Sequence, residues 1–463
     1  MLQYATFYWL RLASLKPHVK ENAEMLWGVH IPYANNILDI RPNQETVIIG
    51  TLFKEMPLKP SILKNVLGVL GTKKFSHGLY VSEDDYAVLE DISGRIRVKR
   101  GANFNHDNFV SGTIIGLRGI VDNNGFFEVI DYCFSGIPYN NPLPLSVAIN
   151  KQRDLYEGLD DPKREFVAFI SGLEFGQTCD VMSVELFLRF MRGELGGPKN
   201  TKLASQISRV VICGNSIVQP EDSDQVLRGS YRVVYKSISD VLDTFENFLD
   251  QLSLMADVDI MPGQDDFSSS FLPQQPLNSC LFPQLQSRDS INLVTNPHKF
   301  KMSGLSFLGT SGQNLNDIYS YTKGTFRNKD DKQYDSLGAL EMILEIRHLC
   351  PSAPDTLRAY PQLESDPFII HQSPHILFAG NQDKYQEKMI VNEATQNSPY
   401  KQGVKLVSVP TFTKSKSIVL LDLTTLQTYE VKFDLSEGVM PARDSAMDGG
   451  TADNGERNSM HLM

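Results

Sequence analysis

The sequence predicts an α+β multidomain protein in which a small β-barrel precedes a larger, layered α/β domain. Short apolar runs with period-two stretches fill residues 45–134, and alternating strand-like and helix-like patterns fill residues 166–433. The final residues have almost no aromatic or β-branched side chains, which is typical of disorder. From the N-terminus, the predicted segments are a helical segment (1–40), the barrel (41–134), a linker (135–165), the α/β domain (166–433) and a disordered acidic tail (434–463).

Composition limits the kinds of protein this chain can be. Its 463 residues suffice for two or three domains, and its hydrophobic content of 41% is enough for sizeable cores. The formal net charge is −11, whereas an autonomous nucleic-acid-binding protein needs an excess of Lys and Arg. We therefore do not expect a strong DNA-binding protein.

Cysteine spacing and apolar runs exclude several further classes. The five cysteines are far apart and form no C-x-x-C pair, so we expect no zinc site, no cofactor and a reducing compartment. Arg11 interrupts the apolar start, and no small-residue cleavage site follows, which argues against a signal peptide. No uncharged apolar stretch approaches the roughly 18 residues of a membrane span.

The N-terminal residues predict a helix over 4–27. A broad apolar stripe precedes Lys16-Pro17, and a second helical segment continues to Trp27. The stripe consists of Tyr4, Phe7, Tyr8, Leu10, Leu12 and Leu15. We expect this helix to pack on its own chain.

The β-rich region predicts a small barrel, with the OB-fold as the leading candidate. Four or five short strands fit into about ninety residues, and Asp122-Asn123-Asn124-Gly125 is a hairpin turn signal. The strands are expected within 45–54, 86–100, 109–121 and 126–134. Residues 135–164 are rich in Pro, Asn and charge, so we interpret them as a linker with room for a short helix.

The strand Arg95-Ile96-Arg97-Val98-Lys99-Arg100 alternates basic and apolar residues, which places its bases on one face. Single-strand binding by an OB-fold also needs aromatic residues on that face. Phe126, Phe127 and Tyr132 are available, although they also suit the core. A single-stranded DNA-binding module and a partner-facing strand both remain open.

The second domain predicts alternating strands and helices. Helical spacing occurs over 181–191, 237–252 and 336–349, and apolar runs predict strands between them. The predicted strands are FVAFISG, RVVICG, VDIMPG, INLVTNP, LSFLGTSG, HILFAGN, VKLVSVP and SIVLLDL.

The strand ends of this domain are the candidate functional site. The run VVICGNSI ends in Gly214-Asn215 at the carboxyl edge of a predicted parallel sheet, where ligands bind in open α/β sheets. A metal enzyme needs anionic oxygen ligands there, and this chain offers a neutral amide. The other strand ends are Ser171-Gly172-Leu173, Gly263-Gln264-Asp265-Asp266 and Gly380-Asn381-Gln382-Asp383.

The order and spacing of these strand ends resemble the calcineurin-like metallophosphoesterases, whose motifs are D-x-H, G-D, G-N-H-[DE] and G-H-x-H. The resemblance implies an α/β sandwich packed against the OB-fold. The metal-ligand positions are degenerate here, and they are occupied by Ser171, Leu173, Asn215, Gln264, Asp265, Asn381 and Asp383. Leu173 cannot ligate a metal, so we expect no catalytic residue and no metal. The alternative is a residual metal-dependent phosphodiesterase or nuclease, with one weakly bound ion at Asp265, Asp266 and Asp383.

Longer stretches resemble the second, B-family regulatory subunits of eukaryotic DNA polymerase delta. They include TLFKEMPLKPSIL, SGTIIGLRGIVDNNGFFEVIDYCF, PGQDDFSSSFLPQQPLNSCLFP, CPSAPDTLRAYP and DPFIIHQSPHILFAGNQ. The resemblance implies a non-catalytic scaffold for DNA replication and repair in the nucleus. The implied partners are the cysteine-rich C-terminal region of the catalytic subunit and the third subunit, with DNA contacted mainly through the complex.

The loop after the third motif is a candidate partner-binding segment. It consists of Leu272, Pro273, Gln274 and Gln275, a proline-rich apolar stretch near the sheet edge. Such a loop can also be a rigid cap over its own domain. Both interpretations remain open.

Overall fold

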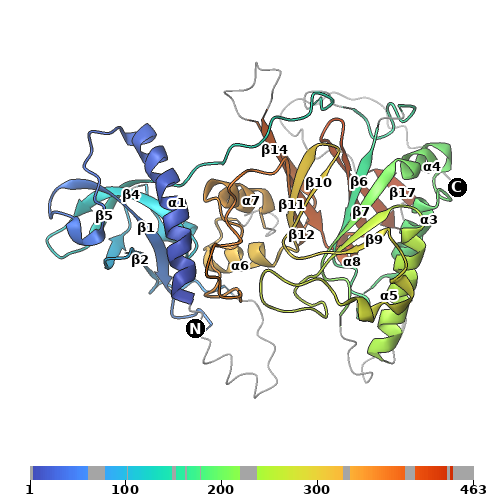
Figure 1. Ribbon diagram of the computed structural model, residues 1–463, viewed down its shortest axis with the longest axis horizontal. Helices are drawn as coiled ribbons and strands as arrows, with labels where there is room; N and C mark the ends of the chain where they lie inside the picture. The colour runs from blue at the N-terminus through green and yellow to red at the C-terminus, as the bar shows by residue number, and fades with distance from the viewer. Residues whose placement is uncertain are drawn as a thin grey trace, which may run out of the picture.

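The computed structural model describes residues 4–60, 79–101, 103–148, 153–161, 164–177, 179–218, 237–326, 334–391, 402–434 and 438–441. A β-barrel lies at one end of the molecule and a layered body of two sheets and flanking helices at the other (Figure 1). Among the described helices, none is long and apolar enough to cross a membrane.

The barrel closes in the order β1-β2-β3-β5-β4. Its strands are β1 (Glu45–Glu55), β2 (Tyr86–Glu90), β3 (Arg95–Lys99), β4 (Thr113–Val121) and β5 (Phe127–Cys133). Alternate side chains such as Leu52, Leu89 and Leu117 point inward and form one apolar core. The predicted turn is present, since the Gly125 amide donates to the Asp122 carbonyl at 3.0 Å between β4 and β5. Two single helical turns, η1 (Ile37–Asp39) and η2 (His106–Asn108), flank the strands.

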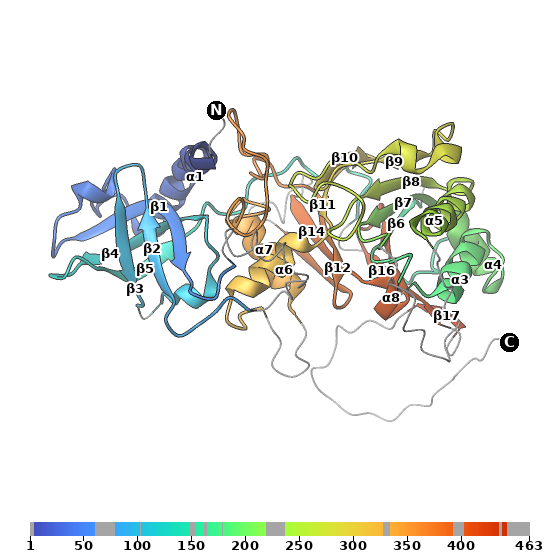
Figure 2. The same ribbon diagram turned by 90° about the horizontal axis from the view of Figure 1, so that it is seen from below.

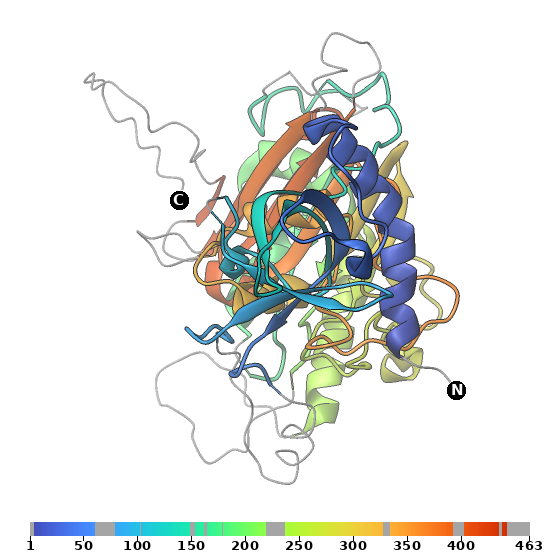
Figure 3. The same cartoon turned by 90° about the vertical axis from the view of Figure 1, so that its left-hand side faces the viewer.

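Helix α1 (Tyr4–Trp27) is one continuous helix with Pro17 inside it, rather than two segments that meet at Pro17. Pro17 lies on the exposed side, so its ring does not disturb the buried face. That face presents Leu12, Leu15 and Val19 to the outside of the barrel. The helix lies along one side of the barrel (Figure 3).

The larger sheet has seven strands in the order β17-β16-β15-β6-β7-β8-β9, and β6 to β9 run parallel. Its strands are β6 (Phe166–Ile170), β7 (Ile207–Cys213), β8 (Asp257–Met261), β9 (Ile291–Leu293), β15 (Ser417–Asp422), β16 (Thr428–Asp434) and β17 (Gly438–Pro441). One face packs against α3 (Val181–Met191), α4 (Gly197–Ser205) and α5 (Ile238–Ser253). Short helical turns η3 (Ser279–Leu281) and η4 (Pro283–Leu285) extend this layer.

The smaller sheet has five strands in the order β10-β11-β12-β14-β13. Its strands are β10 (His298–Met302), β11 (Leu305–Thr310), β12 (Ile376–Gln382), β13 (Gln386–Val391) and β14 (Gly403–Pro410). Its outer face packs against α6 (Gln313–Tyr321) and α7 (Ser336–Glu345). The inner faces of both sheets share one core, in which the Phe169 and Phe378 rings lie 4.7 Å apart. The short helix α8 (Phe412–Ser415) links β14 to β15.

Two regions differ from expectation. We expected no regular structure after residue 433, but Gly438–Pro441 forms an edge strand on β16, because backbone hydrogen bonds alone can extend a sheet. We allowed a short helix within 135–164, but the described residues of this region form none. Segment 135–148 is instead fastened to the second domain, where the Asn140 side chain donates to the Gly403 carbonyl at 2.6 Å.

A buried arginine joins the two halves of the molecule. Arg11 on α1 is fully buried, and its Nε donates to Asp366 Oδ2 at 2.9 Å. Its remaining nitrogens donate to the carbonyls of Gly112 (3.1 Å), Pro351 (2.6 Å) and Ala353 (2.7 Å). Gly112 belongs to the barrel side and the other acceptors to the layered domain. One guanidinium therefore connects α1, the barrel and the layered domain, which meet in Figure 2.

Candidate functional site at the carboxyl edge of the sheets

The candidate site lies where the carboxyl ends of β6, β7, β8 and β12 meet. The Gly172 amide donates to the Gly214 carbonyl at 3.0 Å, which holds the ends of β6 and β7 together. Asn381 Nδ2 donates to the Cys213 carbonyl at 3.3 Å, which joins β12 from the other sheet. The structure therefore brings together the strand ends that the sequence singled out.

Two of the strand-end residues adopt left-handed backbone conformations. Asn215 has φ 53° and Asn381 has φ 54°. Asparagine tolerates this region better than most residues other than glycine. Both sharp turns therefore favour asparagine for conformational reasons, whatever its side chain binds.

Ser171 and Asn381 form one hydrogen-bonded pair. The Ser171 hydroxyl accepts a hydrogen bond from the backbone amide of Asn381 at 2.9 Å and donates one to the Pro410 carbonyl at 3.0 Å. Asn381 Nδ2 also donates to the Ser311 carbonyl at 2.9 Å. Ser171 and the neighbouring Leu173 are completely buried. The hydroxyl therefore serves the backbone of its own chain, and Leu173 is part of the core.

Asn215 and Asp265 form a second pair. Asn215 Nδ2 donates to Asp265 Oδ2 at 3.1 Å, and the Asp265 amide donates back to Asn215 Oδ1 at 3.3 Å. Gln264 and Asp383 are exposed at the rim of the site. The seven predicted positions thus divide into two bonded pairs, one core residue and two exposed side chains.

Asp266 is the buried carboxylate of the site. Its Oδ1 accepts from the amides of Ser216 and Ile217, both at 2.8 Å, and its Oδ2 accepts from the Gly263 amide at 2.7 Å. Burial raises its pKa to about 6, and these backbone donors oppose the shift. Both oxygens are therefore directed at the strand-end backbone, which they hold together.

Sequence reasoning missed an amide network beside these pairs. Gln274 Oε1 accepts from Asn296 Nδ2 at 2.7 Å, and Asn296 Nδ2 also donates to Ser311 Oγ at 2.8 Å. Gln274 Nε2 donates to the Gly263 carbonyl at 2.9 Å, which ties the network to the third motif. Asn296 and Ser311 are the next-to-last residues of the predicted strand segments INLVTNP and LSFLGTSG. Both residues could have been found by looking for polar side chains at the ends of these two strands, as was done for the other four.

The donor set does not fit a two-metal centre. No group of three or more His, Cys, Asp or Glu side chains among the described residues could hold a metal ion. The polar atoms of Ser171 and Asn215 already bond within the chain, and Asn381 Oδ1 is the unsatisfied buried oxygen among these side chains. One neutral oxygen is a poor substitute for the several carboxylates and imidazoles that two metals require. We therefore derive no metal-dependent step.

The candidate partner loop is partly built into the domain. Leu272 and Gln274 are buried, and Gln274 belongs to the amide network described above. Pro273 is half-buried and Gln275 is exposed. Of the four candidates, Pro273 and Gln275 have surface that another molecule could contact.

The basic strand of the barrel presents three cations on its outer face, as its alternation predicts. The Arg97 guanidinium lies over the rings of Tyr86 (4.0 Å) and Phe126 (5.7 Å). Phe127 lies in the barrel core instead, and Tyr132 packs within an aromatic cluster, 5.0 Å from the Phe109 ring. Arg95 pairs with Glu90 at 2.8 Å, and Lys99 pairs with Asp122. Most of the positive charge on this face is therefore already matched within the barrel.

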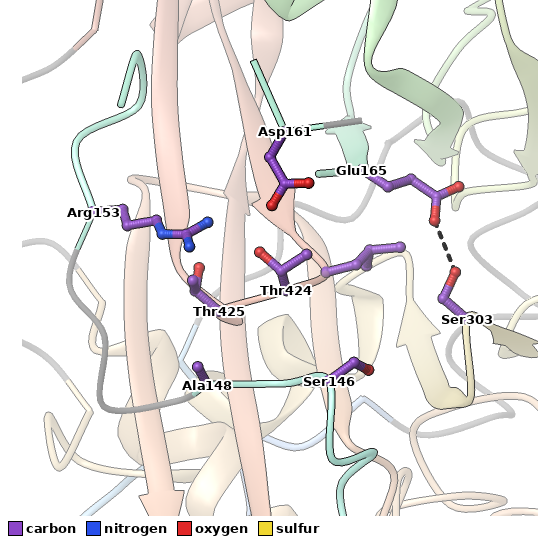
Figure 4. Close-up of a pocket in the computed structure, with 9 residues that line it drawn as sticks. Ser146, Ala148, Arg153, Asp161, Glu165, Ser303, Thr424 and Thr425 are labelled. Atoms are coloured by element: carbon purple, nitrogen blue, oxygen red, sulfur yellow. Dashed lines mark hydrogen bonds between the residues drawn. The ribbon is translucent and has the colours of Figure 1, made fainter. Parts of the chain in front are cut away.

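A separate polar cavity of about 230 Å³ lies at the opposite, amino-terminal edge of β6 (Figure 4). Arg153 and Asp161 point into it, and Ser303 Oγ donates to Glu165 Oε2 at 2.8 Å on one wall. Its distance along β6 from Ser171 separates it from the candidate site. It adds no group to that site.

Two family models match this chain. Residues 167–388 match the model that describes the B subunits of DNA polymerases alpha and epsilon. Residues 3–132 match the model that describes the OB-fold domain of the DNA polymerase delta subunit. The two matches fall on the layered domain and on the barrel with its helix.

Curated relatives match along nearly the whole chain. A DNA polymerase delta small subunit of Oryza sativa subsp. japonica is 33% identical over 444 residues and covers 94% of each chain. Small subunits of the same description are 32% identical in Arabidopsis thaliana and 30% identical in Saccharomyces cerevisiae. These two matches cover 93% and 94% of this chain, and 91% and 90% of the relatives.

Proposed function

This chain belongs to the family of DNA polymerase delta small subunits, and we propose that it is a non-catalytic scaffold of a DNA polymerase delta complex in the nucleus. In this proposal it binds the cysteine-rich C-terminal region of the catalytic subunit and the third subunit. DNA is contacted mainly through the assembled complex. Polymerisation and proofreading belong to the catalytic subunit.

The observation that carries the proposal is the chemistry of the strand ends. Ser171 and Asn215 use their polar atoms to hold neighbouring backbone segments together, and Leu173 is buried in the core. We propose that the layered domain has the calcineurin-like phosphoesterase architecture, kept as a folded body without its hydrolytic centre. Its two sheets, with helices on both outer faces, support this assignment. Segments 1–40, 41–134, 135–165 and 166–433 remain part of the same proposal, and β17 extends the last of them beyond residue 433.

Co-expression tests the scaffold role. The full chain is expressed with the cysteine-rich C-terminal region of the cognate catalytic subunit and passed over a size-exclusion column. The proposal expects stoichiometric co-elution. Separate elution of two folded proteins would contradict it.

A nuclease assay tests the loss of chemistry. The full chain is incubated with single-stranded and nicked DNA in excess Mn²⁺, then with a chelator. We expect no cleavage above a buffer control and no change in melting temperature on chelation. Mn²⁺-dependent cleavage that co-purifies with the chain and disappears in an Asp265→Ala variant would support the phosphodiesterase alternative.

A further inference from the structure

A groove of about 570 Å³ lies between the barrel and the layered domain. One wall is the last turns of α1, the floor is the end of β5 with the residues that follow it, and the other wall is the end of α7. Leu26, Tyr132, Phe134, Ile137, Asp131 and Glu345 contribute its apolar and acidic lining.

The groove exposes apolar side chains that the fold does not cover. Leu26 is 62% exposed and Ile137 is 38% exposed. Exposed apolar groups that line one concave surface are typical of interaction sites. This part of the surface can therefore bury further apolar area when another molecule covers it.

The floor of the groove is preformed. The Tyr132 ring lies 5.0 Å from Phe109 and 5.6 Å from Phe134, within one aromatic cluster. Trp27 Nε1 donates to Asp131 Oδ2 at 2.9 Å, which fixes the end of α1 on β5. A partner would meet a surface that is already ordered, so binding costs little conformational entropy on this side.

The charge of the groove selects the kind of partner. No ion pair joins Glu345 to any residue in the described part of the chain, and its side chain reaches the surface. Partial desolvation against the groove walls and the nearby Glu341 raise the pKa of Glu345, and the more distant Lys388 charge opposes this shift. Lys388 pairs with Glu341, and Arg347 Nε donates to the Gly136 carbonyl at 2.7 Å. A cation brought by a partner would relieve the unmatched charge of Glu345.

We propose that this groove receives a basic amphipathic segment of another polymerase subunit, with its apolar face on Leu26 and Ile137 and a Lys or Arg beside Glu345. The proposal rests on the scaffold function proposed above. Nucleic acid is disfavoured because the groove carries carboxylates, and a second copy of the chain would bring the same carboxylates with it.

Matched variants test the groove in the full chain. Leu26→Asp and Glu345→Lys alter it. Leu254→Asp at the C-cap of α5 and Asp243→Lys within α5 make the same kinds of change far from it. Each is co-expressed with the cognate catalytic subunit and, separately, with the third subunit, and the dissociation constant is measured. Melting temperatures of the free variants show that each chain folds.

We expect both groove variants to weaken binding of one subunit at least tenfold, and both control variants to change it less than twofold. Unchanged binding of both subunits by the groove variants would overturn the groove proposal and leave the scaffold function standing. Failure of the unaltered chain to bind either subunit would overturn the scaffold function and this inference with it. Self-association in sedimentation that the groove variants abolish would show a second copy as the occupant, against the proposal.

Discussion

His348 is held as a neutral imidazole by the groups that contact its two ring nitrogens. Its Nε2 lies 2.8 Å from Asp366 Oδ2, and its Nδ1 accepts from the Cys350 amide at 3.2 Å. Only the tautomer with a proton on Nε2 satisfies both contacts, and a second proton would break the bond to Cys350. Burial, and then the Arg11 charge, lower the pKa of His348 to about 4.

This shift predicts a loss of stability in mild acid. In the unfolded chain His348 takes up a proton near pH 6.5, and in the folded chain only near pH 4. The free energy of unfolding therefore keeps its full value above pH 6.5 and decreases as the pH falls from 6.5 to 4. The decrease is on the order of 3 kcal/mol, from about 1.4 kcal/mol per pKa unit. In His348→Gln, the denaturant midpoint should fall less steeply between pH 7 and pH 4.

His371→Gln is the matched control, because His371 is exposed. Its pH profile should follow that of the unaltered chain. His18, His106 and His375 also have lowered pKa values, so part of the slope should remain in every variant. An unchanged slope in His348→Gln would contradict the neutral buried imidazole.

The positions of the strand-end residues at one edge of the sheets were predictable, but the hydrogen bonds of their side chains were not. The spacing located Ser171, Asn215 and Asn381 correctly at one edge, because strand ends of parallel sheets converge. The sequence did not reveal that Asp266 would cap three backbone amides, or that Asn296 would enter the same network. These partnerships depend on loop conformations that residues distant in sequence determine.

At the scale of elements, α1 approaches β4 closely because β4 carries Gly116. A Cβ at this position would lie 2.9 Å from Val19 Cγ1 and 3.0 Å from Cys133 Sγ. Either neighbour would have to move, and overpacking of this kind costs roughly 1–3 kcal/mol. The missing side chain therefore sets the distance between helix and barrel.

Gly116→Ala should lower the denaturant midpoint, and Gly94→Ala, whose Cβ would meet only Leu38 at 3.9 Å, should not. The chain has two tryptophans, Trp9 and Trp27, and both lie on α1. Tryptophan fluorescence therefore reports on the helix itself. An equal response of both glycine variants would show that the close approach is unimportant.

The outer face of β3 should bind single-stranded DNA weakly or not at all, because Glu90 and Asp122 already match two of its three cations. Fluorescence anisotropy of labelled oligo(dT) with the full chain, at low and moderate salt, measures this. Salt-dependent binding that Arg97→Ala abolishes and Lys199→Ala on α4 does not would favour the single-strand-binding alternative.

Elements with continuous apolar runs were predicted well, and polar elements were missed. The buried strands β6, β7 and β14 stand out in the sequence. Strand β13 is a half-exposed edge strand without a long apolar run, and the N-cap residue of α6, Gly312, has no side chain to cap the helix. Tertiary contacts, rather than local patterns, define these two elements.

At the scale of the whole molecule, the Arg11 junction couples the barrel to the layered domain. Arg11 and Asp366 are both buried, so removing one leaves the other charge without its main partner. Breaking such a pair costs about 3–5 kcal/mol. The two halves should therefore unfold together while the pair is intact.

Arg11→Met should separate the unfolding of α1 from that of the rest. Tryptophan fluorescence, which follows α1, should change at lower denaturant than far-UV circular dichroism, whereas the two should coincide in the unaltered chain. Arg95→Met removes an exposed ion pair with Glu90 and should leave the curves coincident. Coincident curves in Arg11→Met would show that the junction does not depend on this pair.

The same junction determines when the protein can finish folding during synthesis. Arg11 and Asp366 are 355 residues apart, and ribosomes add about 5–20 residues per second, so the acceptor emerges roughly 20–70 s after the helix. Throughout that interval, Phe7 and Arg11 have no layered domain to cover them. Helix α1 is thus completed only after Asp366 has been synthesised, and until then its buried face is exposed to solvent.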